Sequence, residues 1–384
     1  MHYFGLSAAE IDRAGGHWTA QEIAQQPALW RAVAALVDEA AGARFLAPLL
    51  QDPGLRIVLT GAGSSAFVGE CLAPAMTRQL RRRVDAVPTT DVVAGPGNWL
   101  VADTPTLLVS FARSGNSPES VAALQMAQQR LARCHHLVIT CNAQGALGTI
   151  AGGLDNAHVL LLPEECNDKS FAMTSSFSAM LLAAALTFGV LPAPALAAAG
   201  GAAQQLLEHA LPLIQALVGA RYDRVIYLGA NELKGLAREA SLKLLELTDG
   251  RVVSIADTPL GFRHGPKTVV NKRTLVVVFL SGDAYSRAYD IDLVQELRRD
   301  GVAGRVLALA AGSDAGPAHP DTFAVPALPG AGSLAHCLPY VVFAQFLALM
   351  HSLALGIGPD NPNPAGMVNR VVKGVSIYPP EPAW

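Results

Sequence analysis

Apolar runs rich in β-branched residues, each followed by a Gly/Ser turn and a helical pattern, recur along the chain at a fixed spacing. This alternation is typical of a parallel α/β sheet with helices on both faces. The predicted strands are Arg56–Thr60, Thr106–Phe111 and Leu137–Thr140, then Arg224–Leu228, Thr274–Leu280 and Arg305–Ala308. The first two pairs of strands lie 168 residues apart and the third pair 169. This spacing favours two copies of one βα frame over a coincidence among similar buried strands.

Segments of a different character flank and join the two copies. We expect an N-terminal helical segment over residues 1–45, a first subdomain over 46–195, a second over 205–358, and a C-terminal arm over 359–384. Thr19-x-x-Glu22 matches a capping box, which predicts a helix that Pro27 ends or restarts. The apolar stretches 177–192 and 341–356 are too short, or too interrupted by polar residues, for a membrane span and predict buried helices.

The composition excludes several classes of function. Only 15% of the residues are charged and the net charge is −3, so we expect no nucleic-acid partner. The five cysteines form no C-x-x-C pair, which predicts reduced thiols in a cytoplasmic protein and no zinc site. The N-terminus lacks a signal-peptide pattern. We expect no membrane association, metal ion or cofactor.

The turn after the first predicted strand is rich in glycine and serine. Gly61, Gly63 and Ala66 satisfy the G-x-G-x-x-[GA] pattern of dinucleotide-binding proteins. Ser64 and Ser65 stand where a helix begins, and hydroxyls there can join the backbone N–H groups in holding one phosphate. This turn alone fits a nicotinamide-dependent oxidoreductase and a phosphate-binding protein equally well.

The turn after the second strand favours a phosphate. It reads Phe111-Ala-Arg-Ser-Gly-Asn-Ser-Pro-Glu-Ser120, with hydroxyls at Ser114, Ser117 and Ser120, and Gly115 allows a close backbone approach. Pro118 suits the first turn of the next helix. A dinucleotide fold gives no reason for this second turn, whereas a sugar phosphate, with one anion and many hydroxyls, uses both.

In these two turns the sequence resembles the SIS (sugar isomerase) family, which includes the isomerase half of glucosamine-6-phosphate synthase. The resemblance implies two tandem flavodoxin-like subdomains, each a three-layer αβα sandwich with a parallel sheet. Where the synthase has Ser-Gln-Ser, this chain has Ala112-Arg113-Ser114, so one hydroxyl is missing and Arg113 either offers charge or points elsewhere. The implied substrate-binding residues are Gly63, Ser64, Ser65, Arg113, Ser114, Gly115, Asn116, Ser117, Thr174 and Ser175.

The second copy lacks such turns but carries acids and bases. Asp283, in its second turn, would repel a phosphate. Glu239, Lys243 and Glu246 share one helix face, a spacing that by itself is typical of a solvated face with an i,i+4 ion pair. His264 lies in a Gly/Pro-rich loop, where most histidines are merely surface residues.

The resemblance assigns roles to these residues. The synthase carries a Glu-x-x-x-Lys-x-x-Glu helix followed by a His-Gly-Pro loop, and both occur here. Carried across, Glu246 is the base that moves the C1/C2 proton, His264 opens the sugar ring, and Lys243 stabilises the enolate oxygens. In that family the histidine comes from the adjacent subunit, which implies a homodimer or a dimer of dimers with a shared active site. Lys373 resembles the family's tail lysine, which closes over the sugar and can form an imine.

Nearly the whole chain is similar to the group of tagatose-6-phosphate ketose/aldose isomerases and galactosamine-6-phosphate deaminases. The stretches that carry this similarity are Pro88–Asp91, Ser114–Ala123 and Gly261–Lys267. It implies a hexosamine or ketohexose 6-phosphate as substrate, and release of ammonia from galactosamine 6-phosphate. The alternatives are isomerisation without deamination, a non-catalytic sugar-phosphate regulator on the same fold, and the oxidoreductase.

Overall fold

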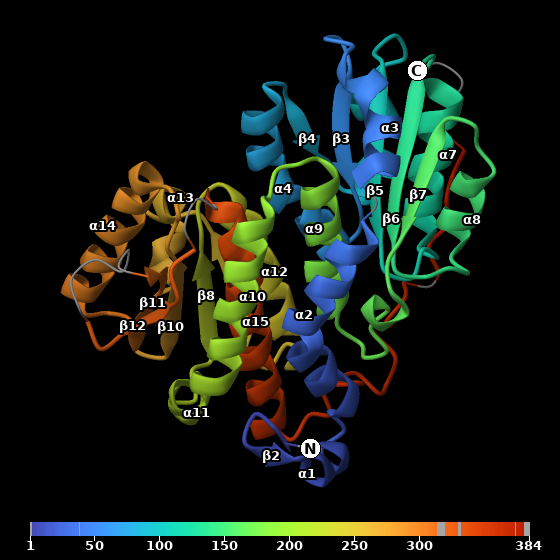
Figure 1. Cartoon of the computed structure of the whole chain (residues 1–384). Helices are drawn as coiled ribbons and strands as arrows, with labels where there is room; N and C mark the ends of the chain where they lie inside the picture. Colours follow the sequence, from blue (N-terminus) through green and yellow to red (C-terminus); the bar gives the residue numbers. More distant parts are fainter. Residues whose placement is uncertain (1, 38, 313–318, 329–331, 373, 380–384) are drawn as a thin grey trace. The chain divides into compact units, whose positions relative to one another are not determined.

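The computed structural model of the protein describes residues 2–37, 39–312, 319–328, 332–372 and 374–379, without the side chains of residues 2, 39, 40 and 43. The chain folds into two compact units, each built from several segments (Figure 1). Unit 1 comprises Met1–Ala28, Asp168–Thr174 and Leu191–Ala365, and unit 2 comprises Leu29–Asn167, Ser175–Val190 and Gly366–Trp384.

Unit 2 holds a five-stranded parallel sheet in the order β4-β3-β5-β6-β7. Its strands are β3 Arg56–Thr60, β4 Val84–Ala86, β5 Thr106–Ala112, β6 Cys134–Thr140 and β7 Ala157–Leu161. Its helices are the end of α2 (His17–Leu36), α3 Glu39–Leu50, α4 Ser64–Leu80, α5 Thr89–Ala94, α6 Pro96–Trp99, α7 Pro118–Arg130, α8 Ala146–Gly152, the 3₁₀ turn η1 Glu164–Cys166 and α9 Ser175–Thr187.

Alternation along the strands divides the core of unit 2 between the two faces of its sheet. Val58 and Leu108 pack against apolar residues of α5 and α7 on one face. Leu59 points to the other face, where α4 passes so close that a side chain at Gly69 would lie 3.0 Å from Leu59 Cβ. Helices α4 and α9 pack together on that face. The strands are thus buried on both sides, as their near-continuous apolar runs predict.

Unit 1 holds a second five-stranded parallel sheet, in the order β12-β11-β10-β8-β9. Its strands are β8 Arg224–Leu228, β9 Val253–Asp257, β10 Thr274–Phe279, β11 Arg305–Ala311 and β12 Thr322–Val325, and a short hairpin pairs β1 His2–Tyr3 with β2 Leu6–Ser7. Its helices are α1 Ala8–Arg13, the start of α2, α10 Ala193–His209, α11 Leu211–Gly219, α12 Glu232–Leu247, α13 Pro259–Phe262, the 3₁₀ turn η2 Pro266–Val269, α14 Ala284–Asp300 and α15 Gly332–Ala354.

Helix α15 closes one face of the sheet in unit 1. It packs against α10 and α12 (Figure 1), and its Tyr340 ring stacks 5.6 Å from Phe279, which stacks 5.9 Å from Tyr227. Among the described residues, α15 is the one helix long and apolar enough to cross a membrane, and 94% of its apolar window is buried within the protein. Both apolar stretches of the sequence are therefore core helices, since α9 is buried along most of its length as well.

The two sheets confirm the predicted repeat. In each, the second strand in chain order lies outside the first and the third lies inside it, and the pair Arg56–Thr106 recurs as Arg224–Thr274. Below the level of whole strands, the spacing of 169 for the third pair is wrong. Leu107 pairs with His135 and Leu275 with Arg305, which places the third strands 170 residues apart.

The predicted N-terminal capping box is also wrong. Helix α2 begins at His17, so Thr19 lies inside its first turn and Pro27 lies in its interior without ending it. The Asp360 carboxylate accepts hydrogen bonds from the main-chain N–H groups of Trp18 (3.0 Å) and Thr19 (2.7 Å) and thereby serves those orphan donors. Glu22 is thus left for other partners, described below.

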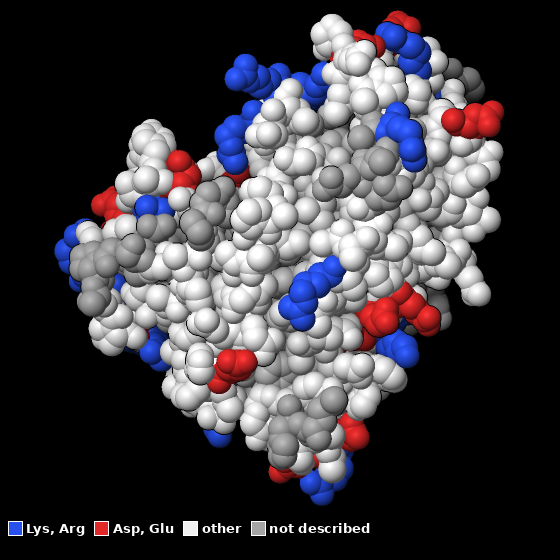
Figure 2. All heavy atoms as spheres, in the orientation of Figure 1, with Lys and Arg blue, Asp and Glu red and all other residues white. Residues whose placement is uncertain are grey.

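Charged side chains are sparse on the molecular surface. Most of the face drawn in Figure 2 is neither acidic nor basic, in keeping with the low charge content of the chain. All five cysteines are buried thiols.

Candidate active site

The first turn of unit 2 presents an uncapped helix N-terminus. Gly61 must be glycine, because a side-chain carbon there would lie 2.6 Å from Ser65. Gly63 has φ +56° and offers no side chain to cap α4, whose first residues Ser64 and Ser65 are buried. Main-chain N–H groups at the start of a 17-residue helix are therefore left for an anion.

The corresponding turn of unit 1 has the same backbone and different chemistry. Asn231, 168 residues after Gly63, has φ +53° and precedes α12 in the same way. The first helical residue is Glu232 in place of Ser64, and it is buried. A buried carboxyl group at this point disfavours a bound phosphate. The second copy thus keeps the shape of the loop without its anion-binding groups.

The second turn of unit 2 is fixed by its own hydrogen bonds. Ser114 Oγ accepts from the N–H of Asn116 (3.2 Å), and Asn116 Oδ1 accepts from the N–H of Ala146 (2.9 Å). Gly115 has φ +66°, and a side chain there would lie 3.1 Å from the Cα of Gly145. Because these contacts hold the loop without a ligand, its conformation is set before anything binds.

Ser117 and Asp283 play the same structural part in the two units. Ser117 is the N-cap of α7, where its hydroxyl accepts from the N–H of Ser120 (3.2 Å). Asp283 is the N-cap of α14 and accepts from the N–H of Ser286 (2.8 Å). Both residues cap a helix, but only the serine leaves the loop uncharged.

Arg113 points away from the turn and toward the C-terminal arm. Its side chain is almost fully buried, and its Nη2 donates to the main-chain carbonyl of Arg370 at 2.7 Å. The sequence left open whether Arg113 offers charge at the turn or points elsewhere. The structure engages its guanidinium with the arm, a contact that nothing in the sequence signals.

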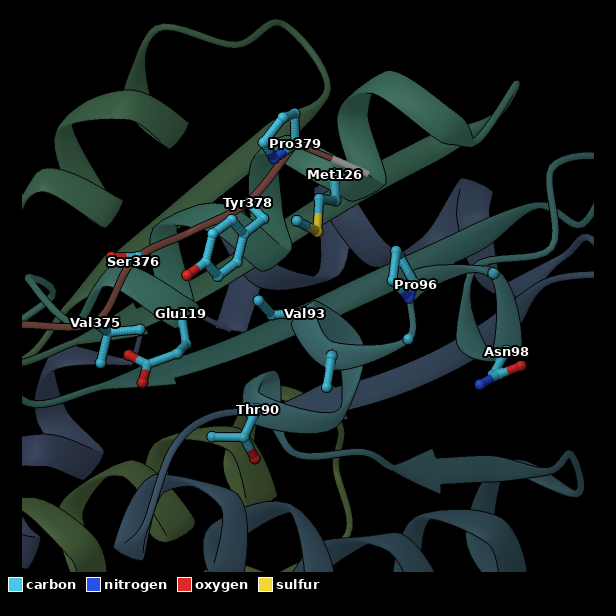
Figure 3. Close-up of a pocket in the computed structure, with 13 residues that line it drawn as sticks. Thr90, Val93, Pro96, Asn98, Glu119, Met126, Val375, Ser376, Tyr378 and Pro379 are labelled. Atoms are coloured by element: carbon cyan, nitrogen blue, oxygen red, sulfur yellow. The ribbon is translucent and has the colours of Figure 1, made fainter. Parts of the chain in front are cut away.

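The arm also covers a cavity of about 610 Å³ in unit 2. Figure 3 shows the arm residues Val375, Ser376 and Tyr378 along one side, with Thr90 and Pro96 of α5 and α6 on the other. Residues of α7, Glu119 among them, complete the lining. Lys373, the predicted tail lysine, lies outside the described residues.

Thr174 and Ser175 lie at the start of α9 and are both fully buried. The Thr174 hydroxyl contacts the carboxyl groups of Glu22 and Asp168, each at 3.3 Å, and Ser175 Oγ lies 3.5 Å from the carbonyl of Glu165. The Thr174 hydroxyl is thus engaged within unit 1, while Ser175 begins the helix in unit 2.

Helix α12 carries a buried cluster of charges. The ammonium of Lys243 lies 3.5 Å from Glu239 and 2.5 Å from Glu246, and neither Lys243 nor Glu239 has any exposed side-chain surface. Spacing alone predicted a solvated face here, and that reading is wrong. Glu246 retains 24% of its side-chain exposure, so one carboxylate of the cluster reaches solvent. Buried charges that serve packing alone are costly, which marks this cluster as a functional candidate.

His264 is exposed on the loop between α13 and η2 in the same unit. The flanking Arg263 and Lys267 both bind the carboxylate of Glu296 on α14, the first at 2.8 Å. These two cations lower the pKa of Glu296. The loop is therefore fastened on both sides of a histidine that stays accessible. Sequence reasoning missed Glu296, because the ion pairs join segments 29 and 33 residues apart.

No group of three or more metal-binding side chains occurs among the residues that the structure describes. The described residues thus place the anion-binding turns in unit 2, and the acids and bases of α12 with the histidine loop in unit 1.

Comparison with known proteins agrees with this division. Residues 49–189 match the SIS domain family model. A relative from Streptomyces coelicolor is 50% identical over 96% of this chain and 97% of its own. The protein from Shewanella sp. (strain ANA-3) named D-galactosamine-6-phosphate deaminase AgaS is 44% identical, with 97% and 95% covered. The crystal structure of tagatose-6-phosphate ketose/aldose isomerase from Escherichia coli superimposes with a TM-score of 0.86 at 42% identity, over 95% of this chain and 97% of that one.

The fold and its turns thus define an SIS-type sugar-phosphate protein. Within that class, the chain belongs to the AgaS family of sugar-phosphate deaminases and isomerases.

Proposed function

We propose that the protein converts galactosamine 6-phosphate and water to tagatose 6-phosphate and ammonia. The observation that carries this proposal is the buried Glu239–Lys243–Glu246 cluster on α12, in a chain whose relatives bear the name of that deaminase. Such a cluster supplies a carboxylate held in a fixed direction, as a proton transfer between neighbouring carbons needs. A protein that only binds sugar phosphates has no use for it.

Binding begins at the phosphate. The uncapped N-terminus of α4 and the loop from Ser114 to Ser117 offer N–H groups and hydroxyls to the anion. Gly63 and Gly115 let the main chain approach, while Ser64 and Ser65 add hydroxyls. Asn116 shapes the loop and Ser175 contributes to the sugar pocket. In this proposal Arg113 and Thr174 act through the arm and through Glu22, without touching the sugar.

The chemistry then proceeds at C1 and C2. His264 transfers the proton that opens the ring, and Glu246 removes the proton from C2 and returns it to C1. The C2–N bond becomes an imine, water adds to C2, and ammonia leaves, so that a ketose 6-phosphate remains. The ammonium of Lys243 orients Glu246 and offsets negative charge that develops on the substrate. Lys373 closes over the sugar.

We further propose that the enzyme acts in the cytoplasm as a homodimer or a dimer of dimers, with His264 serving the active site of the adjacent subunit. The buried thiols suit a reducing compartment. A mixture of two inactive variants, Glu246→Gln and His264→Asn, tests the shared site. Recovery of activity on mixing is expected if each hybrid pair restores one intact site, and the absence of recovery would rule out sharing.

A second reaction has specific support, because the similar crystal structure is that of a ketose/aldose isomerase. One assay separates the two. Galactosamine, glucosamine and N-acetylgalactosamine 6-phosphates are offered in turn, and ammonia and ketose 6-phosphate are both measured. We expect ammonia from galactosamine 6-phosphate. Interconversion of tagatose and galactose 6-phosphates without ammonia from any amino sugar would replace deamination by plain isomerisation.

A further inference from the structure

The segment Asp168–Thr174 contains neither helix nor strand and is held by side chains of unit 1. Glu22 of α2 is central to it. Its Oε1 accepts hydrogen bonds from the N–H groups of Lys169 (2.6 Å) and Ser170 (3.1 Å), and its Oε2 contacts the hydroxyl of Ser170 closely. The Thr174 hydroxyl lies 3.3 Å from the same Oε2. A single buried carboxyl group thus fastens three residues of the segment.

Further contacts tie down the end of the segment. The N–H of Thr174 donates to Asp168 Oδ2 (2.8 Å), and its carbonyl accepts from Gln345 of α15 (3.2 Å). The next residue is Ser175, the first residue of α9. The direction in which the chain begins this helix is therefore set by the network around Glu22.

The hydrogen atoms in this network do not suffice if Glu22 is ionised. The Ser170 hydroxyl faces Glu22 Oε2 and the carbonyl of Ala172 (3.1 Å), and the Thr174 hydroxyl faces Glu22 Oε2 and Asp168 Oδ1 (3.3 Å). These four contacts share two hydroxyl protons, since each hydroxyl donates once. A proton on Glu22 adds a donor to Ser170, which then turns its own hydrogen to Ala172, and three of the four contacts are satisfied.

The electrostatic surroundings act in the same direction. Burial, and after it the nearby carboxyl group of Asp168, raises the pKa of Glu22 to about 7, although the hydrogen bonds from Ser170 and Lys169 oppose this rise. The other charges of the packed elements are engaged elsewhere. Asp360 binds the start of α2, and the Lys169 ammonium lies 4.3 Å from the centre of the Trp18 ring. The contact from α15 is the uncharged amide of Gln345.

We propose that Glu22 is a positioning residue that works in its protonated form, holding Asp168–Thr174 so that Ser175 is correctly placed in the sugar pocket. The role of Ser175 rests on the proposed function, whereas the hold on the segment does not. Loss of the proton puts a second negative charge beside Asp168 and removes one donor, so the segment loosens and the substrate binds less tightly.

The substitution Glu22→Gln isolates the proton. The glutamine carbonyl can accept from the N–H groups of Lys169 and Ser170, while its NH₂ donates to both hydroxyls at every pH. Glu164→Gln, at an exposed position, removes the same charge and serves as the control. Between pH 6 and 8 the protonated fraction of a group with a pKa near 7 falls about ten-fold. If only that form binds, the KM of the wild type rises up to about ten-fold more than that of Glu22→Gln.

Two readouts test the proposal. The first is amide hydrogen exchange of residues 168–174 without substrate, corrected for the intrinsic rate at each pH. We expect protection to fall from pH 6 to 8 in the wild type and in Glu164→Gln, and to persist in Glu22→Gln. The second is the KM and kcat of ammonia release, where KM should lose this pH dependence in Glu22→Gln with little change in kcat. In Glu22→Ala, protection should be lost at both pH values.

The possible failures are distinguishable. Equal protection at pH 6 and 8 in the wild type would overturn the proposal without any variant. So would a KM profile of Glu22→Gln that follows the wild type while ammonia release proceeds. If no ammonia is released from any substrate but the exchange data behave as expected, the proposed function fails and the role of Glu22 in holding the segment stands.

Discussion

The buried guanidinium of Arg113 donates a hydrogen bond to the main-chain carbonyl of Arg370, 257 residues further along the chain. Arg113 directly precedes the loop from Ser114 to Ser117, and Arg370 lies on the arm that covers the cavity in unit 2. This contact connects the two parts, so that a change in the loop is felt by the arm.

Replacing Arg113 should release the arm. A hydrogen bond from a charged donor contributes about 1.5–3 kcal/mol, and the shorter side chain of Arg113→Gln cannot reproduce it. We expect faster proteolytic cleavage within residues 366–379 and a KM raised by roughly ten-fold or more. Limited proteolysis with mass spectrometry and steady-state kinetics measure the two effects. Arg83→Gln is the control, because Arg83 is 88% exposed. An arm that resists cleavage equally in both variants would contradict this prediction.

Glu246→Gln should remove turnover and leave binding. The amide keeps the shape of the side chain but cannot take a proton, and a general base contributes about 10²–10⁴-fold to the rate. We expect kcat to fall by that factor with KM within about two-fold of the wild type. Glu208→Gln, an exposed position on α10, should be unaffected. Normal turnover in Glu246→Gln would remove Glu246 from the role of base.

Ser117→Asp should separate stability from binding, because Asp283 already occupies the equivalent cap in unit 1. Asp caps a helix as well as Ser does, so the free energy of unfolding should stay within about 0.5 kcal/mol of the wild type. Two unit charges 4 Å apart near a protein surface repel by about 4 kcal/mol, so affinity for a sugar phosphate should fall roughly 100-fold or more. Thermal unfolding and calorimetric titration measure both quantities. Ser117→Thr should keep cap and affinity, and tight binding by Ser117→Asp would place the phosphate elsewhere.

Stability should depend on pH through Glu22. Its pKa is raised to about 7 from 4.5, so the folded protein holds a proton that the unfolded chain loses between these values. The free energy of unfolding therefore falls as pH rises from about 4.5 to 7 and levels off above, by about 3 kcal/mol from this group. Glu22→Gln should lack this fall, whereas Glu164→Gln should keep it. Urea unfolding at pH 5, 6, 7 and 8 provides the comparison, and parallel curves for all three proteins would show that Glu22 does not titrate in this range.

Much of the sheet architecture could be predicted, because buried parallel strands write themselves as apolar runs. Arg56–Thr60 and Arg224–Leu228 have the predicted bounds, and their partners pair in the predicted frame. The offset of the third strands could not be obtained, since a one-residue slip between apolar strands changes nothing in the pattern. Thr19 and Glu22 satisfied a local rule that Asp360, 341 residues from Thr19, overrode.

The candidate site was predictable where the backbone demands particular residues. Gly115, with its positive φ, and Ser117, with its cap, are visible in a sequence because few residues can replace them. The burial of Glu239 and Lys243 was not visible, since an i,i+4 ion pair reads alike on a wet and a dry helix face. Only the packing of α12 against α15, which lie about a hundred residues apart, decides between the two.

The late position of α15 also has a consequence during synthesis. Its apolar surface closes unit 1 against α10 and α12, both of which leave the ribosome more than eighty residues earlier. At a translation rate of about 5–20 residues per second, those two helices wait several seconds with their apolar faces uncovered. The sheet of unit 2, complete with α9, carries no such delay. Nascent chains halted before Gly332 should therefore be clients of chaperones that bind exposed apolar segments.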